Sequence, residues 1–322
     1  MEALPAFDIV RPATLEDAVA ALAGEGAMVL AGGTDTIPNI RRRLFSPERL
    51  VDITALDELR AIEETPDGVI LGAGVTLSAL IDNQAVAARY PALVKAAKTI
   101  AGPQHRNAGT IGGNLLQDTR CVFYNQSEWW RSANNYCLKY SGDVCHVAPK
   151  SARCFAAYCS DLAPVLVALG GEAELLGPDG ARRAALEELF AEDGADHRRL
   201  KPGEILLRLH IPAPPAQVDY EKVRLREAID FPLVGVAVAL ACKKGVLTSL
   251  RIALTGTNSR PLLLEETAGF IGKPVDEAML DHLVKLVRKQ IGAMKTTLTT
   301  TKYRRQVAPA LVRDMVRRLA AA

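Results

Sequence analysis

The sequence VLAGGTDTIPNIRR, residues 29–42, decides the fold of this chain. Its apolar beginning, residues 29–31, is typical of a short buried strand. Gly32 and Gly33 then let the backbone turn where a side chain would collide. The next two residues, Thr34 and Asp35, place hydrogen-bonding groups near the exposed amides. Successive N–H groups in such a turn form a concavity that binds an anion such as a diphosphate.

Two further glycine turns follow. The second loop, AGTIGGNLLQDT at residues 108–119, has the same features as the first: glycines that allow close backbone approach, hydrogen-bond donors and the carboxamide of Asn114. Neither loop matches the GxGxxG fingerprint, so the two together favour a nucleotide held by loops instead of a Rossmann helix. LGAGVTLSAL, residues 71–80, predicts a strand that ends before a helix capped near Thr76 or Ser78.

Length and composition indicate a globular chain of about two domains. The 322 residues are 49% hydrophobic and 24% charged, and the net charge of +2 gives no electrostatic reason to expect nucleic acid or a membrane surface. No apolar run approaches the roughly 18 residues of a spanning helix. The first residues lack the basic and apolar regions of a secretory signal. We therefore expect the cytoplasm, where clustered cysteines bind metal more often than they form disulfides.

Five of the six cysteines, both tryptophans and half of the aromatic residues lie between Cys121 and Cys159. No CxxC pair occurs among them, which weakens a zinc-finger or simple ferredoxin interpretation. Four alternatives remain at this point: small buried hydrophobes, as we expect for Cys242, disulfides, a zinc site with His146 as a nitrogen ligand, or an iron–sulfur cluster. The aromatic surroundings favour a cluster, because excluding water helps to set its potential.

Other patterns predict the remaining organisation. A strand near residues 7–10 precedes a helix that begins at Thr14 with a cap-like sequence. IPAPPAQ, residues 211–217, predicts a linker, because its prolines cannot join a central strand. The next apolar runs predict a β-hairpin that turns at Lys243-Lys244-Gly245. Helices are expected at about residues 262–270, 276–292 and 305–320.

Together, AGGTDTIPN and AGPQHRNAGTIGGN resemble the FAD-binding subunit of the xanthine dehydrogenase and carbon monoxide dehydrogenase group of molybdenum hydroxylases. SDLAPVLVALGGEAEL and YEKVRLREAIDFPLVGVAVAL continue the resemblance in the expected order. The resemblance implies an α+β fold. A PCMH-type FAD-binding domain would span residues 1–212, with subdomains of about 1–58 and 59–212, and an α+β C-terminal flavoprotein domain would span 217–322.

The resemblance also implies which residues bind FAD. In that family the first loop wraps the diphosphate, the TIGGN segment contacts the cofactor, and an aspartate, a lysine and two apolar residues complete the site. Here these are Val29, Leu30, Ala31, Gly32, Gly33, Thr34, Asp35, Thr36, Ile100, Thr110, Ile111, Gly112, Gly113, Asn114, Asp161, Leu207 and Lys222. No catalytic acid–base pair is expected, and His105 is interpreted as a hydrogen-bonding residue at the solvent or flavin rim.

The chain departs from the common family pattern between Asn114 and Asp161, which are separated by 46 residues instead of a short segment. The extra residues, 115–160, are called the cysteine module below. DTRCVFYNQSEWWR, NNYCLKYSGDVCH and SARCFAAY resemble the segment of the 4-hydroxybenzoyl-CoA reductase flavin subunit that carries a [4Fe–4S] cluster. The resemblance implies Cys121, Cys137, Cys145 and Cys154 as ligands and leaves Cys159 as a non-ligand.

The function implied is that of an electron-transfer flavoprotein subunit in such a reductase, part of aromatic compound degradation. Reduced ferredoxin would supply electrons through the cluster and FAD to partner subunits. Those partners would hold [2Fe–2S] clusters and the molybdenum cofactor, in a dimer of heterotrimers. Two alternatives stay open: an FAD subunit that passes electrons from an oxidised substrate to NAD or a quinone, and a zinc-stabilised docking surface without a redox role.

Overall fold

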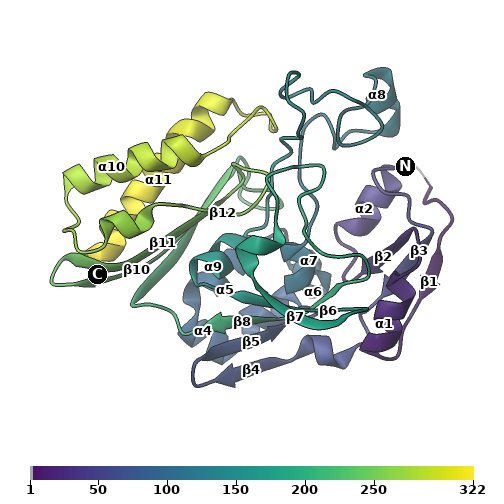
Figure 1. Ribbon diagram of the computed structural model, residues 1–322, viewed down its shortest axis with the longest axis horizontal. Coiled ribbons are helices and arrows are strands. Elements are labelled where there is room, and N and C mark those ends of the chain that lie inside the picture. Colours follow the sequence, from purple (N-terminus) through teal and green to yellow (C-terminus); the bar gives the residue numbers. More distant parts are fainter. Residues whose placement is uncertain (1–2) are drawn as a thin grey trace.

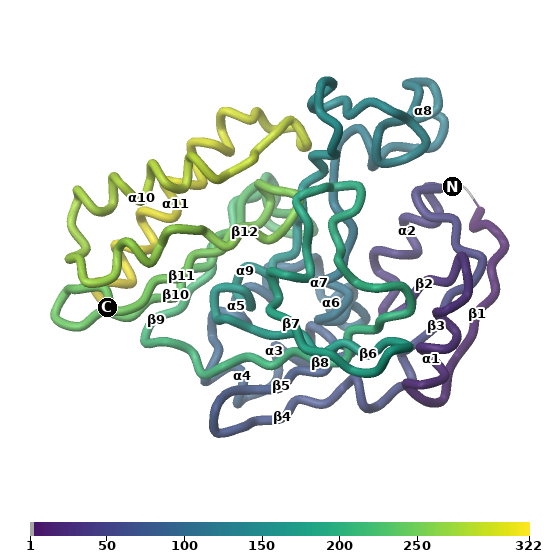
Figure 2. Tube along the Cα trace, in the orientation of Figure 1, coloured from purple at the N-terminus to yellow at the C-terminus, as the bar shows by residue number. Residues whose placement is uncertain are grey.

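The computed structural model describes residues 3–322 and contains three β-sheets that follow one another along the chain (Figures 1 and 2). A small parallel sheet lies at one end, a five-stranded sheet lies in the middle, and a sheet covered by two long helices lies at the other end. The predicted α+β class is confirmed.

The first sheet is parallel and has the strand order β1-β3-β2. Parallel neighbours need crossover connections, and helices supply them here. The helix after β1 begins at Thr14 as predicted, because the Thr14 hydroxyl accepts a hydrogen bond from the Asp17 amide at 3.1 Å. The elements are β1 (Asp8–Val10), α1 (Leu15–Leu22), β2 (Ala27–Leu30), α2 (Thr36–Arg41), β3 (Arg49–Asp52) and a 3₁₀ helix, η1 (Asp57–Arg60).

The central sheet is antiparallel, with the order β4-β5-β8-β6-β7. Helix α9 is buried along its whole length, because it packs between this part of the molecule and the C-terminal sheet. The elements are β4 (Ile62–Thr65), β5 (Gly68–Gly72), α3 (Leu77–Asp82), α4 (Gln84–Arg89), α5 (Pro91–Lys98), α6 (Pro103–Ala108), α7 (Ile111–Leu115), α9 (Leu162–Ala168), β6 (Glu172–Gly177), β7 (Gly180–Ala185), η2 (Leu186–Leu189) and β8 (Ile205–Pro212). As predicted, α3 is capped by Thr76.

The C-terminal sheet is antiparallel, with the order β12-β11-β10-β9, and helices α10 and α11 cover it (Figure 1). Its central hairpin turns where predicted, with positive φ at Lys244 (52°) and Gly245 (77°). Two such residues are typical of the turn that matches strand twist. The elements are β9 (Gln217–Val223), β10 (Val234–Lys243), β11 (Val246–Thr255), β12 (Leu262–Leu263), η3 (Thr267–Phe270), α10 (Glu277–Gln290) and α11 (Thr301–Ala320).

Three local predictions need correction. The helix expected at 262–270 is wrong: Leu262 and Leu263 pair with β11, and only one short 3₁₀ turn follows. The predicted linker is shorter than 211–217, because Ile211 and Pro212 complete β8 and Gln217 begins β9. Helix α11 begins at Thr301, before the predicted residue 305, because the Thr300 hydroxyl caps it.

The cysteine module projects from the body of the molecule between the first sheet and the C-terminal helices (Figures 1 and 2). It contains one helix, α8 (Glu128–Ala133), and otherwise consists of turns and loops. Its two ends come together in a short antiparallel bridge between Arg120 and Ala157. The module is therefore a loop excursion that leaves the central fold and returns to it at one place.

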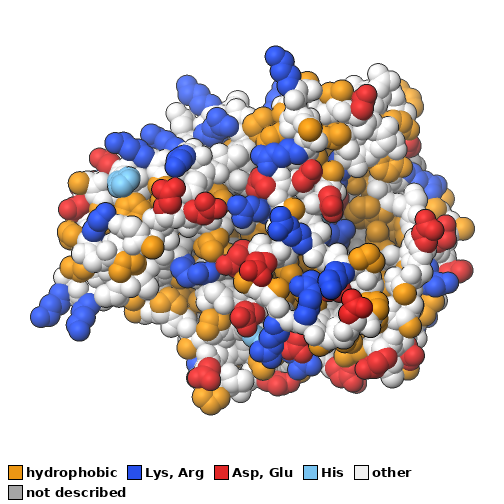
Figure 3. Space-filling model, in the orientation of Figure 1, with side chains coloured by type: hydrophobic (Ala, Val, Ile, Leu, Met, Phe, Trp, Pro, Cys, Tyr) orange, Lys and Arg blue, Asp and Glu red, His pale blue; other side chains and the backbone are white. Residues whose placement is uncertain are grey.

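The surface has no single-sign field on the face drawn in Figure 3, where acidic and basic side chains are interspersed. This distribution agrees with the net charge of +2. Within residues 3–322, none of the helices combines the length and the apolar character that a membrane span requires.

Candidate functional site

A cavity of about 790 Å³ opens where the first sheet, the central sheet and the loop at residues 229–231 meet. Its volume lies toward the upper end of the roughly 300–1,000 Å³ that is usual for ligand pockets. Both glycine loops contribute to its wall. The strand before the first loop, β2, is half-buried instead of fully buried, because Ala27, Met28 and Val29 line this cavity.

Close backbone contact explains the glycines of the two loops. A Cβ at Gly32 would lie 1.8 Å from the carbonyl oxygen of Ala108, which leads into the second loop. A Cβ at Gly112 would lie 2.9 Å from the carbonyl oxygen of Ala73. Gly33 adopts a φ of +68°, which favours glycine for a different reason. The collision inferred from the sequence would therefore occur: a side chain at Gly32 would meet the second loop, and one at Gly112 would meet the turn at residues 71–80.

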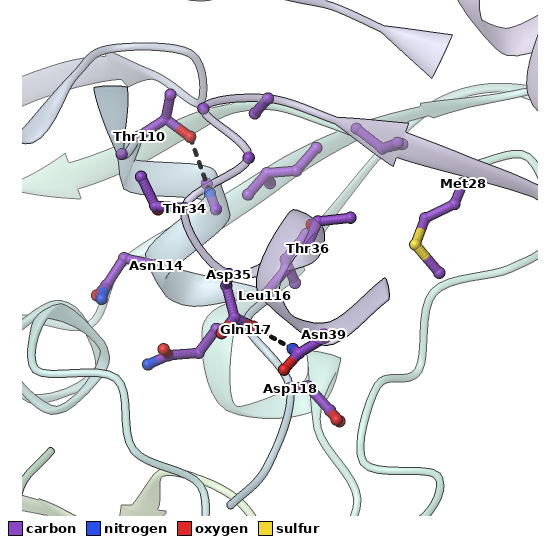
Figure 4. A pocket seen from close by; sticks show the side chains of 18 of the residues that line it. Met28, Thr34, Asp35, Thr36, Asn39, Thr110, Asn114, Leu116, Gln117 and Asp118 are labelled. Carbon is purple, nitrogen blue, oxygen red and sulfur yellow. Dashed lines mark hydrogen bonds between the residues drawn. The ribbon is translucent and has the colours of Figure 1, made fainter. Parts of the chain in front are cut away.

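Local hydrogen bonds fix the polar groups of both loops (Figure 4). The Thr110 hydroxyl accepts a hydrogen bond from the Gly113 amide at 3.0 Å and caps α7. The side-chain amide of Asn39 donates to the Asp35 carboxylate at 3.1 Å. The side-chain oxygen of Asn114, Oδ1, accepts hydrogen bonds from the Ser160 hydroxyl at 2.8 Å and from the Leu162 backbone amide of α9 at 3.3 Å. Asn114 thus joins the second loop to the far end of the cysteine module.

A buried charged network lies at the base of the cavity. Asp161 accepts hydrogen bonds from the Tyr220 hydroxyl at 2.6 Å and from the Lys222 ammonium at 2.9 Å. Lys222 also donates to the backbone carbonyls of Thr99 and Asp230. Burial raises the pKa of Asp161, and the Lys222 charge opposes this shift. The network holds one carboxylate at the cavity wall with partners from the C-terminal sheet.

Most of the predicted FAD-binding residues lie together. Those that line the cavity are Val29, Ala31, Gly32, Gly33, Thr34, Asp35, Thr36, Ile100, Thr110, Gly112, Gly113, Asn114 and Asp161. The remaining four, Leu30, Ile111, Leu207 and Lys222, are not part of that lining. Ile111 and Leu207 are core residues, and Lys222 reaches the site through Asp161. His105 is exposed and borders the cavity.

Several lining residues were not predicted. They come from the start of the cysteine module, from the segment before β8 and from the loop before β10: Gln117, Asp118, Arg120, Asp196, Arg198, Lys201, Ile229, Asp230 and Phe231. Arg120 pairs with Asp35, and its guanidinium lies 4.8 Å from the centre of the Phe231 ring. Several of them lie within the quoted segments 108–119 and 220–240, but nothing in those segments marks them as lining residues, because only the fold brings their loops to the cavity.

The four cysteines implied as ligands surround a second, small cavity inside the cysteine module. Cys121, Cys145 and Cys154 are 7%, 4% and 6% exposed, and Cys137 is partly buried. The rest of the lining is largely apolar or aromatic: Phe123, Tyr124, Leu138, Lys139, His146, Val147 and Ala156. Cys159 lies elsewhere, at the wall of the large cavity, and Cys242 lies on β10.

The arrangement of the thiols bears on the alternatives left open by the sequence. All six cysteines are free, which argues against disulfides. Among the described residues, no three His, Cys, Asp or Glu side chains converge closely enough to hold a single metal ion. A cubane cluster makes a different demand, because each of its four thiolates binds a different iron around a shared core. The cavity of about 10 Å³ would have to widen around such a core.

Burial also favours the protonated form of two of these thiols, Cys121 and Cys154. It raises the pKa of Cys121 to about 11 and that of Cys154 to about 12. A metal binds the thiolate and must therefore displace these protons. The four sulfurs fit a soft metal centre in donor type, number and shielding from water.

Comparisons with known proteins agree with this architecture. The family described as "FAD binding domain in molybdopterin dehydrogenase" matches residues 5–214, and the "CO dehydrogenase flavoprotein C-terminal domain" matches residues 219–319. The carbon monoxide dehydrogenase medium chain of Afipia carboxidovorans is 32% identical over 97% of this chain and 96% of its own length. The aldehyde oxidoreductase FAD-binding subunit PaoB of Escherichia coli is 32% identical over 78% of this chain and 80% of its own.

A solved structure extends the likeness to three dimensions. The structure of reconstituted CO dehydrogenase from Oligotropha carboxidovorans has a chain with a TM-score of 0.81 and 31% identity, covering 99% of both chains. The two family matches together span most of this sequence, and the Afipia relative aligns over nearly its full length. Both findings agree with a nucleotide site formed by the two glycine loops at the large cavity. The chain therefore belongs to the family of FAD-binding medium subunits of molybdenum hydroxylases and CO dehydrogenases.

Proposed function

We propose that this chain is the electron-transfer flavoprotein subunit of a molybdenum enzyme of the 4-hydroxybenzoyl-CoA reductase type, holding a [4Fe–4S] cluster in addition to FAD. One observation carries the proposal: Cys121, Cys137, Cys145 and Cys154, spread over 34 residues of sequence, line one buried cavity, while Cys159 and Cys242 lie outside it. Four thiols around a common centre are the ligand set of such a cluster.

Under this proposal the chain's own residues bind and shield the two groups. The glycine loops, Ile100 and Asp161 hold FAD, with Lys222 acting through Asp161 and Leu207 packing in the core beside Val29 and Ala31. Phe123, Tyr124 and Leu138 keep water from the cluster. When bound, the cluster supplies one-electron transfer from a low-potential donor such as reduced ferredoxin, and FAD supplies the capacity to hold two electrons. The thiols stay reduced in the cytoplasm, the compartment we propose.

The remaining chemistry belongs to partner subunits. We propose one partner with [2Fe–2S] clusters and another with the molybdenum cofactor, assembled as a dimer of heterotrimers. Reductive removal of the phenolic hydroxyl from 4-hydroxybenzoyl-CoA would take place on the molybdenum subunit. The names of the relatives as medium chains or FAD-binding subunits support a role within a larger assembly.

A second candidate function is favoured by the same relatives, which include carbon monoxide dehydrogenase and aldehyde oxidoreductase. In that alternative the chain is the FAD subunit of a substrate-oxidising enzyme and passes electrons to NAD or a quinone. The glycine loops and their cavity suit both functions. The four cysteines around one cavity favour the first, because the second gives them no role.

The deciding experiment is low-temperature EPR with iron, sulfide and zinc analysis on the full chain, purified without oxygen and then reduced. We expect about four irons and one FAD per chain and a fast-relaxing cluster signal. Serine at Cys121, Cys137, Cys145 or Cys154 should abolish the iron signal and leave FAD bound, because the glycine segments 29–36 and 110–114 lie outside the module and these four cysteines are not part of the lining of the large cavity. Serine at Cys159 or Cys242 should preserve both groups.

Three other outcomes would redirect the assignment. Flavin without iron in protein kept from air would remove the cluster and, with it, the basis for the reductase type. One zinc per chain would support a docking surface instead. A cluster that is present but is not reduced by ferredoxin, together with a flavin that reacts readily with NADH, would favour the substrate-oxidising alternative.

A further inference from the structure

One buried ion pair crosses the wall between the two cavities. The Lys139 ammonium lies 2.6 Å from a carboxylate oxygen of Asp118, and the two side chains are only 4% and 7% exposed. Lys139 lines the cysteine cavity, whereas Asp118 lines the large cavity. Figure 4 shows Asp118 among the residues of the large cavity. The pair therefore spans the wall, with Lys139 at the cysteine cavity and Asp118 between Lys139 and the large cavity.

The surroundings hold this pair in place. Lys139 also donates to the Thr119 hydroxyl, and its ammonium lies 4.5 Å from the centre of the Tyr124 ring. The second carboxylate oxygen of Asp118 is buried and has no hydrogen-bond partner within residues 3–322. The electric field of a buried ion pair reaches farther than that of a surface pair, because the protein interior screens charges more weakly than water does.

We infer that the Lys139–Asp118 pair sets the reduction potential of the proposed cluster relative to that of the flavin. The inference rests on the proposed function, since it needs both groups. A cation beside the thiolates stabilises the reduced, more negative cluster, and a carboxylate beside the flavin disfavours the reduced flavin. The pair thus reduces the difference in reduction potential between the low-potential cluster and FAD.

The equilibrium concerned is a one-electron exchange. The reduced cluster loses one electron and the oxidised flavin gains it, and the electron comes originally from the low-potential donor. Lys139 and Asp118 are positioning residues in this exchange, because they act through the charges of their ion pair and carry no electron themselves. If the pair acts through its charges, removing the positive charge should lower the reduction potential of the cluster, and removing the negative charge should raise it. A pair with only a structural role would not produce shifts of opposite sign.

The test is a redox titration of the full chain, following the cluster by EPR and the flavin by absorbance. Lys139→Met should make cluster reduction at least tenfold less favourable, a shift of about 59 mV to lower potential for one electron. Asp118→Asn should shift the cluster to higher potential, because it leaves the cation uncompensated. Lys150→Met is the matched control, since it removes one charge from an exposed site in the same module.

Each outcome decides something. Opposite shifts in the two variants, with Lys150→Met unchanged, support the inference. Shifts in the same direction, or none beyond that of the control, overturn it while leaving the cluster and the proposed function intact. If Lys139→Met fails to assemble, the direction seen with Asp118→Asn decides. Absence of iron from the unaltered chain would reject the proposed function, and this inference with it.

Discussion

His197 is a buried histidine that packs under the cysteine module. It is 2% exposed, its ring lies 6.2 Å from that of Tyr158, and its Nε2 donates to the carbonyl of Gln117 at 3.0 Å. Gln117 belongs to the wall of the large cavity. Burial, with help from nearby Arg198 and Lys139, lowers the pKa of His197 to about 4. The native protein therefore contains this histidine in its neutral form.

A pH-dependent loss of stability follows from that shift. Between the unfolded pKa of 6.5 and the folded value of about 4, the unfolded chain binds the proton and the folded chain does not. Stability from neutral His197 is present above pH 6.5 and is lost as the pH falls toward 4. At about 1.4 kcal/mol per pH unit, the loss approaches about 3 kcal/mol. Urea unfolding between pH 6.5 and pH 4 should show this loss of unfolding free energy in the unaltered chain and not in His197→Gln.

The matched control is His282→Gln at an exposed position of α10, which should follow the curve of the unaltered chain. Equal pH slopes for His197→Gln and the unaltered chain would contradict the assignment.

Single residues also show why part of the site was predictable. Gly32 could be read from the sequence, because a tight backbone turn restricts residue type locally. Asp118 and Lys139 could not, because their partnership depends on a loop of 20 intervening residues closing on itself. A charged residue in a polar loop is ordinarily solvated, and nothing in the local pattern marks these two as buried.

At the scale of elements, α8 anchors the cysteine module to the first part of the chain. Its Arg131 is 2% exposed and donates to the carbonyls of Arg42 and Arg43, just after α2, at 2.9 Å each. The same guanidinium pairs with Glu128 and lies 4.5 Å from the centre of the Tyr140 ring. One side chain thus connects the end of α2, helix α8 and the loop that carries Cys137.

We expect Arg131→Met to release the module from α2 while leaving the flavin site folded. Hydrogen bonds to a charged group contribute about 1.5–3 kcal/mol each, so losing the two bonds to Arg42 and Arg43 should make local opening about 10²–10⁴-fold more frequent. Limited proteolysis should then cut within residues 115–160 faster by a similar factor, and iron content should fall while FAD stays bound. Trp129→Ala on the same helix is the control, because Trp129 is 76% exposed. Equal cleavage rates in the two variants would disprove the anchoring role.

The elements that the sequence predicted well have local causes. The hairpin at Lys244-Gly245 and the helix capped by Thr76 depend on turn and capping chemistry within a few residues. The segment 262–270 was misread as a helix, because its apolar residues suit either structure. There Leu262 is buried against the sheet and its backbone pairs with β11, so tertiary contact decides the conformation.

At the scale of the whole molecule, one network joins the two parts matched by different families. Asp161 precedes α9 in the FAD-binding part, and its partners Tyr220 and Lys222 lie on β9 in the C-terminal part. The Lys222 and Asp161 side chains are 2% and 5% exposed. Helix α9 packs against β10 and β11 beside this network. The two parts therefore meet at the large cavity, where Asp161 comes from the first part and Ile229, Asp230 and Phe231 come from the second.

Lys222→Met tests this dependence between domains, because it leaves the Asp161 carboxylate buried without its charge partner. Breaking such a pair costs about 3–5 kcal/mol, so urea unfolding of the FAD-free chain should show a loss of that size. Lys95→Met is the matched control: Lys95 also bridges to β9, through Asp219 and Glu221, but is 43% exposed. A pair this accessible contributes at most about 1 kcal/mol. If Lys222→Met and Lys95→Met lose similar amounts of unfolding free energy, burial of the Asp161–Lys222 pair does not determine the stability of the contact between the two domains. A large loss confined to Lys222→Met, accompanied by weaker FAD binding, would place the coupling at the cavity floor.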